Sequence, residues 1–193
     1  MQLIHFNNAQ QITTPSAITV GSFDGVHLGH QALLQQVNSF AHQNNCQSVV
    51  VTFNPHPQEV LQINPDFFLI NTFEQKIALF EKFGIDMVVI IPFSKEFSQK
   101  TANEFFENYI FSKINVKAVF MGPNHHFGKR REGNADTLHS ICKEKNIKLF
   151  TTQEFIRDGQ EVRSTQIRKY LEKKEWKNAE KLMGHKFYSK SYD

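Results

Sequence analysis

The chain has 193 residues, of which 40% are hydrophobic and 21% charged, an ordinary globular composition that excludes a disordered chain. Lys and Arg exceed Asp and Glu by 22 − 19 = 3, so the net charge gives no reason to expect a nucleic-acid or membrane-surface partner. The length suits one domain.

Five short apolar runs alternate with helical patterns along the chain. The runs predicted as strands cover residues 16–22, 48–53, 86–91, 116–120 and 147–150. Because these runs are apolar throughout, rather than alternately apolar and polar, we expect a parallel sheet that is buried on both faces. The predicted fold class is therefore α/β, with a parallel sheet between helices.

Helices are predicted where apolar residues recur at spacings of three and four. The helix after the first strand carries such a stripe, formed by Leu33, Val37, Phe40 and Ala41. Residues 73–83 form another helix, which we expect to end at Gly84. Two short helices, over 164–174 and 176–183, are expected to flank the sheet. Most of the 19 Phe residues are assigned to core stripes, and a minority to stacking on a ligand.

The two cysteines, Cys46 and Cys142, have neither each other nor histidines at the spacing of a zinc site, so we expect reduced thiols. The N-terminal residues MQLIHFNNAQQ lack the basic and apolar regions of a signal peptide. No apolar run approaches the roughly 18 residues of a membrane span. The sequence predicts a soluble, cytoplasmic protein with no membrane contact and no obligate protein partner evident.

The first predicted strand runs directly into a turn rich in glycine and histidine, which opens a helix. Ligands of open α/β sheets lie beyond the carboxyl ends of strands, where a helix N-terminus favours phosphate. The turn fits neither GxGxxG nor the P-loop. We expect His27 and His30 to donate to one oxyanion, with Gly29 allowing close approach of the backbone. A turn that merely contains histidine and a zinc pair are the alternatives, although no third zinc ligand has a suitable spacing.

The residues 21–30 (GSFDGVHLGH) carry the HxGH signature of nucleotidyltransferases. The whole string resembles the FMN adenylyltransferase module of bacterial bifunctional riboflavin kinase/FAD synthetase. The resemblance continues in the same order through residues 52–57 (TFNPHP), 122–134 (GPNHHFGKRREGN), 164–168 (STQIR) and 176–187 (WKNAEKLMGHKF).

This resemblance implies a Rossmann-like enzyme that transfers AMP from ATP to FMN, giving FAD and pyrophosphate. It also implies Mg²⁺, which substrate oxygens would largely hold because no acidic cluster is evident in the sequence. Two other functions remain open. One is an HxGH nucleotidyltransferase acting on a different phosphorylated acceptor, and the other is a noncatalytic flavin or nucleotide sensor.

The resemblance also implies a role for each matching position. The expected catalytic residues are His27, His30, Ser164 and Arg168. The expected ATP-binding residues are Gly21, Ser22, Phe23, Asp24, Gly25, Gly29 and Thr165. The expected FMN-binding residues are Asn54, Pro55, His56, Pro57, Asn124, Phe127 and Gly128. No protein ligand to a metal is expected.

Helix geometry gives Ser164 and Arg168 a second reading. The Ser164 hydroxyl is expected to cap a helix, beside whose free N–H groups Arg168 would help to hold pyrophosphate. The basic residues 129–131 are either phosphate contacts or a solvated charged loop.

Three positions depart from the family pattern. His125 stands where the family has an aromatic residue, His126 where it has a basic or polar one, and Arg163 where it has serine. In the bifunctional proteins a riboflavin kinase module follows the element seen here at 184–187. We therefore expect one adenylyltransferase domain over 1–187, a tail over 188–193, and no kinase domain in this chain.

Overall fold

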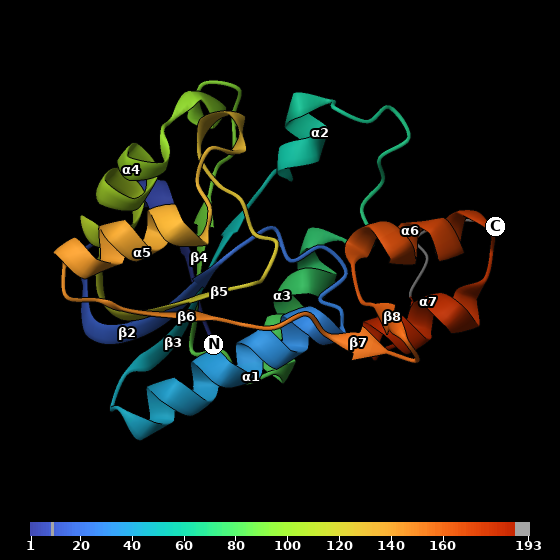
Figure 1. The fold of residues 1–193 in the computed structure, drawn as a ribbon, viewed down its shortest axis with the longest axis horizontal. Helices are drawn as coiled ribbons and strands as arrows, with labels where there is room; N and C mark the ends of the chain where they lie inside the picture. Colours follow the sequence, from blue (N-terminus) through green and yellow to red (C-terminus); the bar gives the residue numbers. More distant parts are fainter. Residues whose placement is uncertain (9, 188–193) are drawn as a thin grey trace.

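A computed structural model of the chain describes residues 1–8 and 10–187, so the expected tail over 188–193 lies outside the described residues. Its main sheet consists of β1 (Gln2–His5), β2 (Ile12–Val20), β3 (Gln47–Phe53), β4 (Met87–Ile91), β5 (Ile114–Met121) and β6 (Lys148–Thr151). The strand order is β1-β4-β3-β2-β5-β6, and every neighbouring pair is parallel (Figure 1). The predicted α/β class is confirmed.

The helices connect these strands in chain order. They are α1 (Leu28–Gln43), α2 (Pro57–Leu61), α3 (Phe73–Lys82), α4 (Ala102–Phe105), a π-helical turn (Phe106–Phe111), α5 (Ala135–Glu144), α6 (Ser164–Glu172) and α7 (Trp176–Met183). Between β6 and α6 a small antiparallel hairpin joins β7 (Ile156–Arg157) to β8 (Gln160–Glu161). The five strands and four helices predicted from apolar patterns are confirmed. The sequence reading missed β1, an edge strand whose residues are mostly exposed.

Helices cover both faces of the sheet (Figure 1). In β3, Val49 and Val51 belong to the core formed with α4 and α5, whereas Val50 belongs to the core formed with α1 and α3. Successive strand residues point to opposite faces, so a strand covered on both sides must be apolar at every position. This requirement explains the continuous apolar runs in the sequence.

The two C-terminal helices, which were expected to flank the sheet, pack on each other and on the chain around Ile70. Their core contains Ile167 and Leu171 from α6 together with Leu182 and Met183 from α7. Figure 1 shows this pair at one side of the molecule, beyond the start of α1. Each helix buries the apolar stripe of the other, so the pair forms a core separate from those on the two faces of the sheet.

The order of the strands creates a natural binding place. From β2 the chain passes through α1 to β3 on one side, while β5 lies on the other side of β2. Ligands of open parallel sheets bind beyond the carboxyl ends of the strands where this order reverses.

Within the described residues, no helix is long and apolar enough to cross a membrane.

Candidate functional site

Two adjoining cavities lie beyond the carboxyl ends of the central strands. The first, here called the polar cavity, has a volume of about 440 Å³ and is lined in part by Asp24, His27, His30, Glu154, Ser164 and Arg168. The second, the aromatic cavity, measures about 540 Å³ and is lined in part by Phe53, Phe93, Phe97, Phe105 and Phe127. A common wall, which includes Ser22, His56, Asn124, His125 and Arg131, belongs to both.

The polar cavity brings together most of the residues expected to bind nucleotide. All four expected catalytic residues line it, as do Gly21, Ser22, Phe23, Asp24, Gly29 and Thr165. Gly25 does not line it and instead packs against Ile70. Asp24 and Arg168, which lie 144 residues apart in the sequence, therefore meet here, because the turn after β2 lies beside α6.

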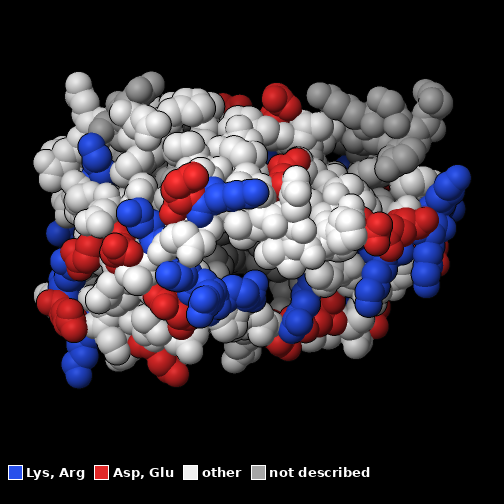
Figure 2. All heavy atoms as spheres, turned by 90° about the horizontal axis from the view of Figure 1, so that it is seen from above, with Lys and Arg blue, Asp and Glu red and all other residues white. Residues whose placement is uncertain are grey.

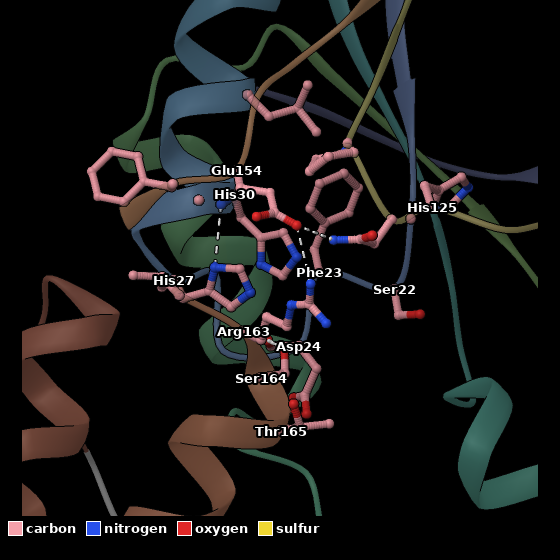
Figure 3. Close-up of a pocket in the computed structure, with 18 of the residues that line it drawn as sticks. Ser22, Phe23, Asp24, His27, His30, His125, Glu154, Arg163, Ser164 and Thr165 are labelled. Carbon is pink, nitrogen blue, oxygen red and sulfur yellow. Dashed lines mark hydrogen bonds and ion pairs between the residues drawn. The ribbon is translucent and has the colours of Figure 1, made fainter. Parts of the chain in front are cut away.

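His27 and His30 lie side by side at the start of α1 (Figure 3). Their rings stack with centroids 3.6 Å apart and planes 15° from parallel. His27 is the N-cap of α1, and its Nδ1 accepts a hydrogen bond of 3.3 Å from the His30 backbone N–H. That bond leaves the ring proton of a neutral His27 on Nε2. Nδ1 of His30 is buried without a partner among the described residues.

Both imidazoles are neutral at physiological pH. Burial lowers the pKa of His27 to about 4, with a further lowering by the charge of Arg168. Burial also lowers the pKa of His30 well below its ordinary value, and the adjacent His27 acts in the same direction. A neutral imidazole still has one N–H donor, so the pair can donate to a phosphate without itself being charged.

Asp24 and Arg168 form a buried ion pair that connects the turn after β2 to α6. The carboxylate of Asp24 pairs with Arg168 and accepts backbone N–H bonds of 3.0 Å from Ile70 and 3.4 Å from Asn71. Arg168 also donates from Nε to the Phe68 carbonyl oxygen at 2.8 Å. Burial raises the pKa of Asp24, and the charge of Arg168 opposes that rise. The guanidinium of Arg168 is therefore bound to other groups of the protein.

Ser164 does not cap α6 as expected. Arg163 occupies the N-cap position without a capping side-chain bond, and the Ser164 hydroxyl donates instead to the Asp24 carbonyl oxygen at 2.8 Å. Arg163 pairs with Glu154 at 3.2 Å (Figure 3) and, from its Nε, with Glu161. The backbone of the turn after β2 thus competes successfully for the serine hydroxyl.

Asn124 extends this polar cluster across the cavity. Its Nδ2 donates to Oε1 of Glu154 at 3.1 Å and to Oε1 of Glu161 at 3.2 Å. The two carboxylates are the same ones that Arg163 contacts. Sequence reasoning missed both glutamates, because nothing in their local pattern indicates that β8 and the end of β6 meet at this edge.

The aromatic cavity gathers most of the residues expected to bind FMN. His56, Pro57, Asn124, Phe127 and Gly128 line it. Asn54 lines a small separate cavity of about 20 Å³, and Pro55 lines none of the three cavities. In the stretch 54–57, His56 is the N-cap of α2 and Pro57 is its first residue. His56 caps that helix by accepting from the Gln58 N–H at 3.1 Å.

Lys76 is a buried cation that sequence reasoning missed. Its Nζ donates to the Ser22 carbonyl oxygen and to Thr52 Oγ1, each at 3.2 Å, and to the Phe53 carbonyl oxygen at 3.4 Å. It therefore joins the carboxyl ends of β2 and β3. Burial lowers the pKa of Lys76 to about 8, while Asp24 opposes the shift. A lysine on the apolar stripe of α3 was the signal that could have identified it.

The described residues contain no group of three or more His, Cys, Asp or Glu side chains able to hold a metal ion. A cation that entered with phosphates would thus have to take most of its ligands from them and from water.

The fold and the site together define a class of protein. A parallel sheet with a cavity beyond the carboxyl ends of its central strands, and with the HxGH turn opening the first helix there, is the nucleotidyltransferase-like α/β arrangement. A family model for FAD synthetase matches residues 9–166. The chain belongs to the FAD synthetase family.

Curated relatives agree with this membership. The chain is 33% identical over 189 residues to a bifunctional riboflavin kinase/FMN adenylyltransferase from Buchnera aphidicola subsp. Schizaphis graminum, covering 97% of this chain and 61% of the relative. It is 31% identical over 185 residues to the protein of that name from Haemophilus influenzae, covering 95% and 60%. The chain therefore spans about three-fifths of the length of these relatives.

Solved structures share the fold. A macrolide-efflux protein from Streptococcus pneumoniae superposes with a TM-score of 0.85 at 26% identity, covering 97% of this chain and 72% of that one. A pantoate-beta-alanine ligase from Francisella tularensis reaches 0.54 at 14% identity, covering 87% and 73%. The second likeness concerns the fold alone.

Proposed function

We propose that this chain is an FMN adenylyltransferase, which transfers AMP from ATP to FMN and releases pyrophosphate. The observation that carries the proposal is that a polar cavity containing the HxGH histidines adjoins an aromatic cavity through a common wall. A nucleotide fits the first, and a flat aromatic acceptor fits the second. The names of the curated relatives, which include FMN adenylyltransferase, support this assignment of substrates.

The reaction needs positioning and charge stabilisation more than proton transfer. A phosphate oxygen of FMN, already anionic, attacks the α-phosphorus of ATP, and the bond from that phosphorus to the bridging oxygen of the leaving pyrophosphate breaks. His27 and His30 would donate N–H bonds to phosphate oxygens as negative charge builds. Thr165, at the start of α6, and the backbone N–H groups of that helix end would receive the departing pyrophosphate.

Arg168 and Ser164 act here mainly through other groups. Because Arg168 is paired with Asp24 and Ser164 with the Asp24 carbonyl oxygen, both hold the turn that carries His27. Mg²⁺ carried by the triphosphate would supply further charge neutralisation, with phosphate oxygens and water as its main ligands.

The test is a reaction of the purified chain with ATP, Mg²⁺ and FMN, followed by chromatography of the flavins and measurement of pyrophosphate. FAD and pyrophosphate should appear in equal amounts. Other phosphorylated acceptors, assayed in parallel, separate FMN from the acceptors of related nucleotidyltransferases. Flavin binding without any pyrophosphate release would instead indicate a noncatalytic sensor.

A variant links this activity to the site. His30→Ala should lower turnover by roughly 10²–10³-fold, about 2.7–4 kcal/mol, because it removes a preorganised donor to the developing oxyanion. Binding of ATP should change less, since that charge grows in the transition state. Turnover within a few-fold of the parent, with an unchanged melting temperature, would remove His30 from the catalytic machinery.

A further inference from the structure

The polar cavity has few cationic side chains, and most of them are already paired. Its lining contains Arg131, Arg163 and Arg168 and no lysine. Arg168 is bound to Asp24, and Arg163 to Glu154 and Glu161. The side chain of Arg131 has no hydrogen bond or ion pair with any residue that the structure describes. Arg131 is thus the uncommitted guanidinium of this cavity.

Arg131 also occupies a particular place, because it lines both cavities. Its neighbour Arg130 and the more distant Lys100 line only the aromatic cavity. A flavin ring in the aromatic cavity and a nucleotide in the polar cavity must be joined through a phosphate at their common wall. Figure 2, which views the molecule from above the orientation of Figure 1, shows Lys and Arg side chains beside a hollow. Acidic and basic side chains are mixed over the rest of this surface. An unpaired guanidinium at the wall matches such a phosphate in charge and geometry.

The loop that carries Arg131 is fixed by contacts at both ends. Phe127 and Gly133 exchange two backbone hydrogen bonds of 3.1 and 2.9 Å, which close residues 127–133 into a tight loop. Gly128 has φ +74°, and a Cβ there would lie 2.7 Å from the Ala102 backbone nitrogen. Arg131 itself has φ +62°. Non-glycine residues hold such a conformation only where their surroundings impose it, commonly at functional sites.

Resting on the proposed function, we propose that Arg131 is a specificity-determining residue that binds the terminal phosphate of the flavin acceptor. It thereby distinguishes FMN from riboflavin, which has the same ring system and no phosphate. The arginine also brings the attacking phosphate to the wall beside His125, through which the two substrates meet. ATP makes its main contacts elsewhere and depends little on this residue.

The test measures binding rather than catalysis. Dissociation constants for FMN and riboflavin are obtained from flavin fluorescence titrations of the parent chain, Arg131→Met and Arg130→Met. The parent should bind FMN more tightly than riboflavin. Arg131→Met should lose about ten- to hundredfold in FMN affinity, the range expected for one charged hydrogen-bonded pair, and should keep its riboflavin affinity. The cost should shrink as salt concentration rises.

Arg130→Met is the matched control, because it removes the same charge from the adjacent residue. Arg130 also has a positive φ, but it lines only the aromatic cavity. It should preserve the preference for FMN. The inference would be overturned if both variants lost FMN affinity equally, or if Arg131→Met lost affinity for ATP instead of FMN. It would also be overturned if the parent chain bound riboflavin as tightly as FMN. FAD formation by the parent chain tests the proposed function separately, so the two can fail independently.

Discussion

At the scale of single residues, His27 combines two tasks that compete for its ring. Its Nδ1 caps α1, and only Nε2 remains to donate toward a ligand. The HxGH spacing predicted two donors, but it did not predict that the first histidine would be a cap. Capping fixes the tautomer and the orientation of the ring before any substrate arrives, which is the preorganisation that transition-state stabilisation requires.

The burial of His27 makes stability depend on pH. Its pKa is about 4 in the folded chain against an ordinary 6.5, so between these values the unfolded chain binds more protons. Stability is therefore expected to fall as pH falls from about 7 to 4, by about 3 kcal/mol from this residue alone. Urea unfolding at a series of pH values measures it.

His27→Asn is the control for that prediction, because asparagine can accept the same capping bond but does not titrate. The variant should show a shallower decline of unfolding free energy between pH 7 and 4. Parallel curves for the two proteins would mean that other groups, such as His56 and His125, whose pKa values are also lowered by burial, account for the whole effect.

At the scale of elements, the end of α7 is fixed by one glycine. Gly184 is left-handed, with φ +71°, and a Cβ there would lie 2.5 Å from Cδ2 of Leu28 in α1. The sequence pattern correctly predicted that this helix ends at residue 183, directly before the glycine. It could not predict the contact with α1, because that contact depends on how the C-terminal pair packs.

Two glycine substitutions separate the backbone effect from the packing effect. Gly159 in the β7–β8 turn also has positive φ, at +76°, but a Cβ there would meet nothing within 4 Å. Gly159→Ala should cost about 1–2 kcal/mol of unfolding free energy from the backbone alone. Gly184→Ala should cost a further 1–3 kcal/mol, roughly, from overpacking against Leu28. Equal losses of unfolding free energy for the two variants in denaturant would show that α7 moves away from Leu28 at no cost.

At the scale of the whole molecule, the Asp24–Arg168 ion pair holds the C-terminal helices to the sheet. The two residues lie 144 apart in the sequence and both are buried. The resemblance to the family predicted that both belong to the nucleotide site, and both do line the polar cavity. Their pairing depends on the position of α6 beside the turn after β2.

Breaking this pair should affect folding as well as activity. Arg168→Met leaves a buried carboxylate without its partner and should cost about 3–5 kcal/mol of unfolding free energy. The double variant Asp24→Asn with Arg168→Met should cost clearly less than the sum of the single changes, because the two residues are coupled. Additive costs in a double-mutant cycle would contradict the pairing.

The sequence by itself determined the parallel sheet, four of the helices (α1, α3, α6 and α7) and the histidine-rich turn that lines the polar cavity. These follow from local patterns, because apolar spacing and glycine placement act over a few residues. Only the tertiary structure decided that Ser164 binds the turn after β2, that Lys76 joins β2 to β3, and that Arg131 is the unpaired arginine of the polar cavity. Whether a charged side chain is paired depends on which groups, distant in the sequence, lie next to it in the folded chain. Such pairing produces no periodic pattern in the sequence.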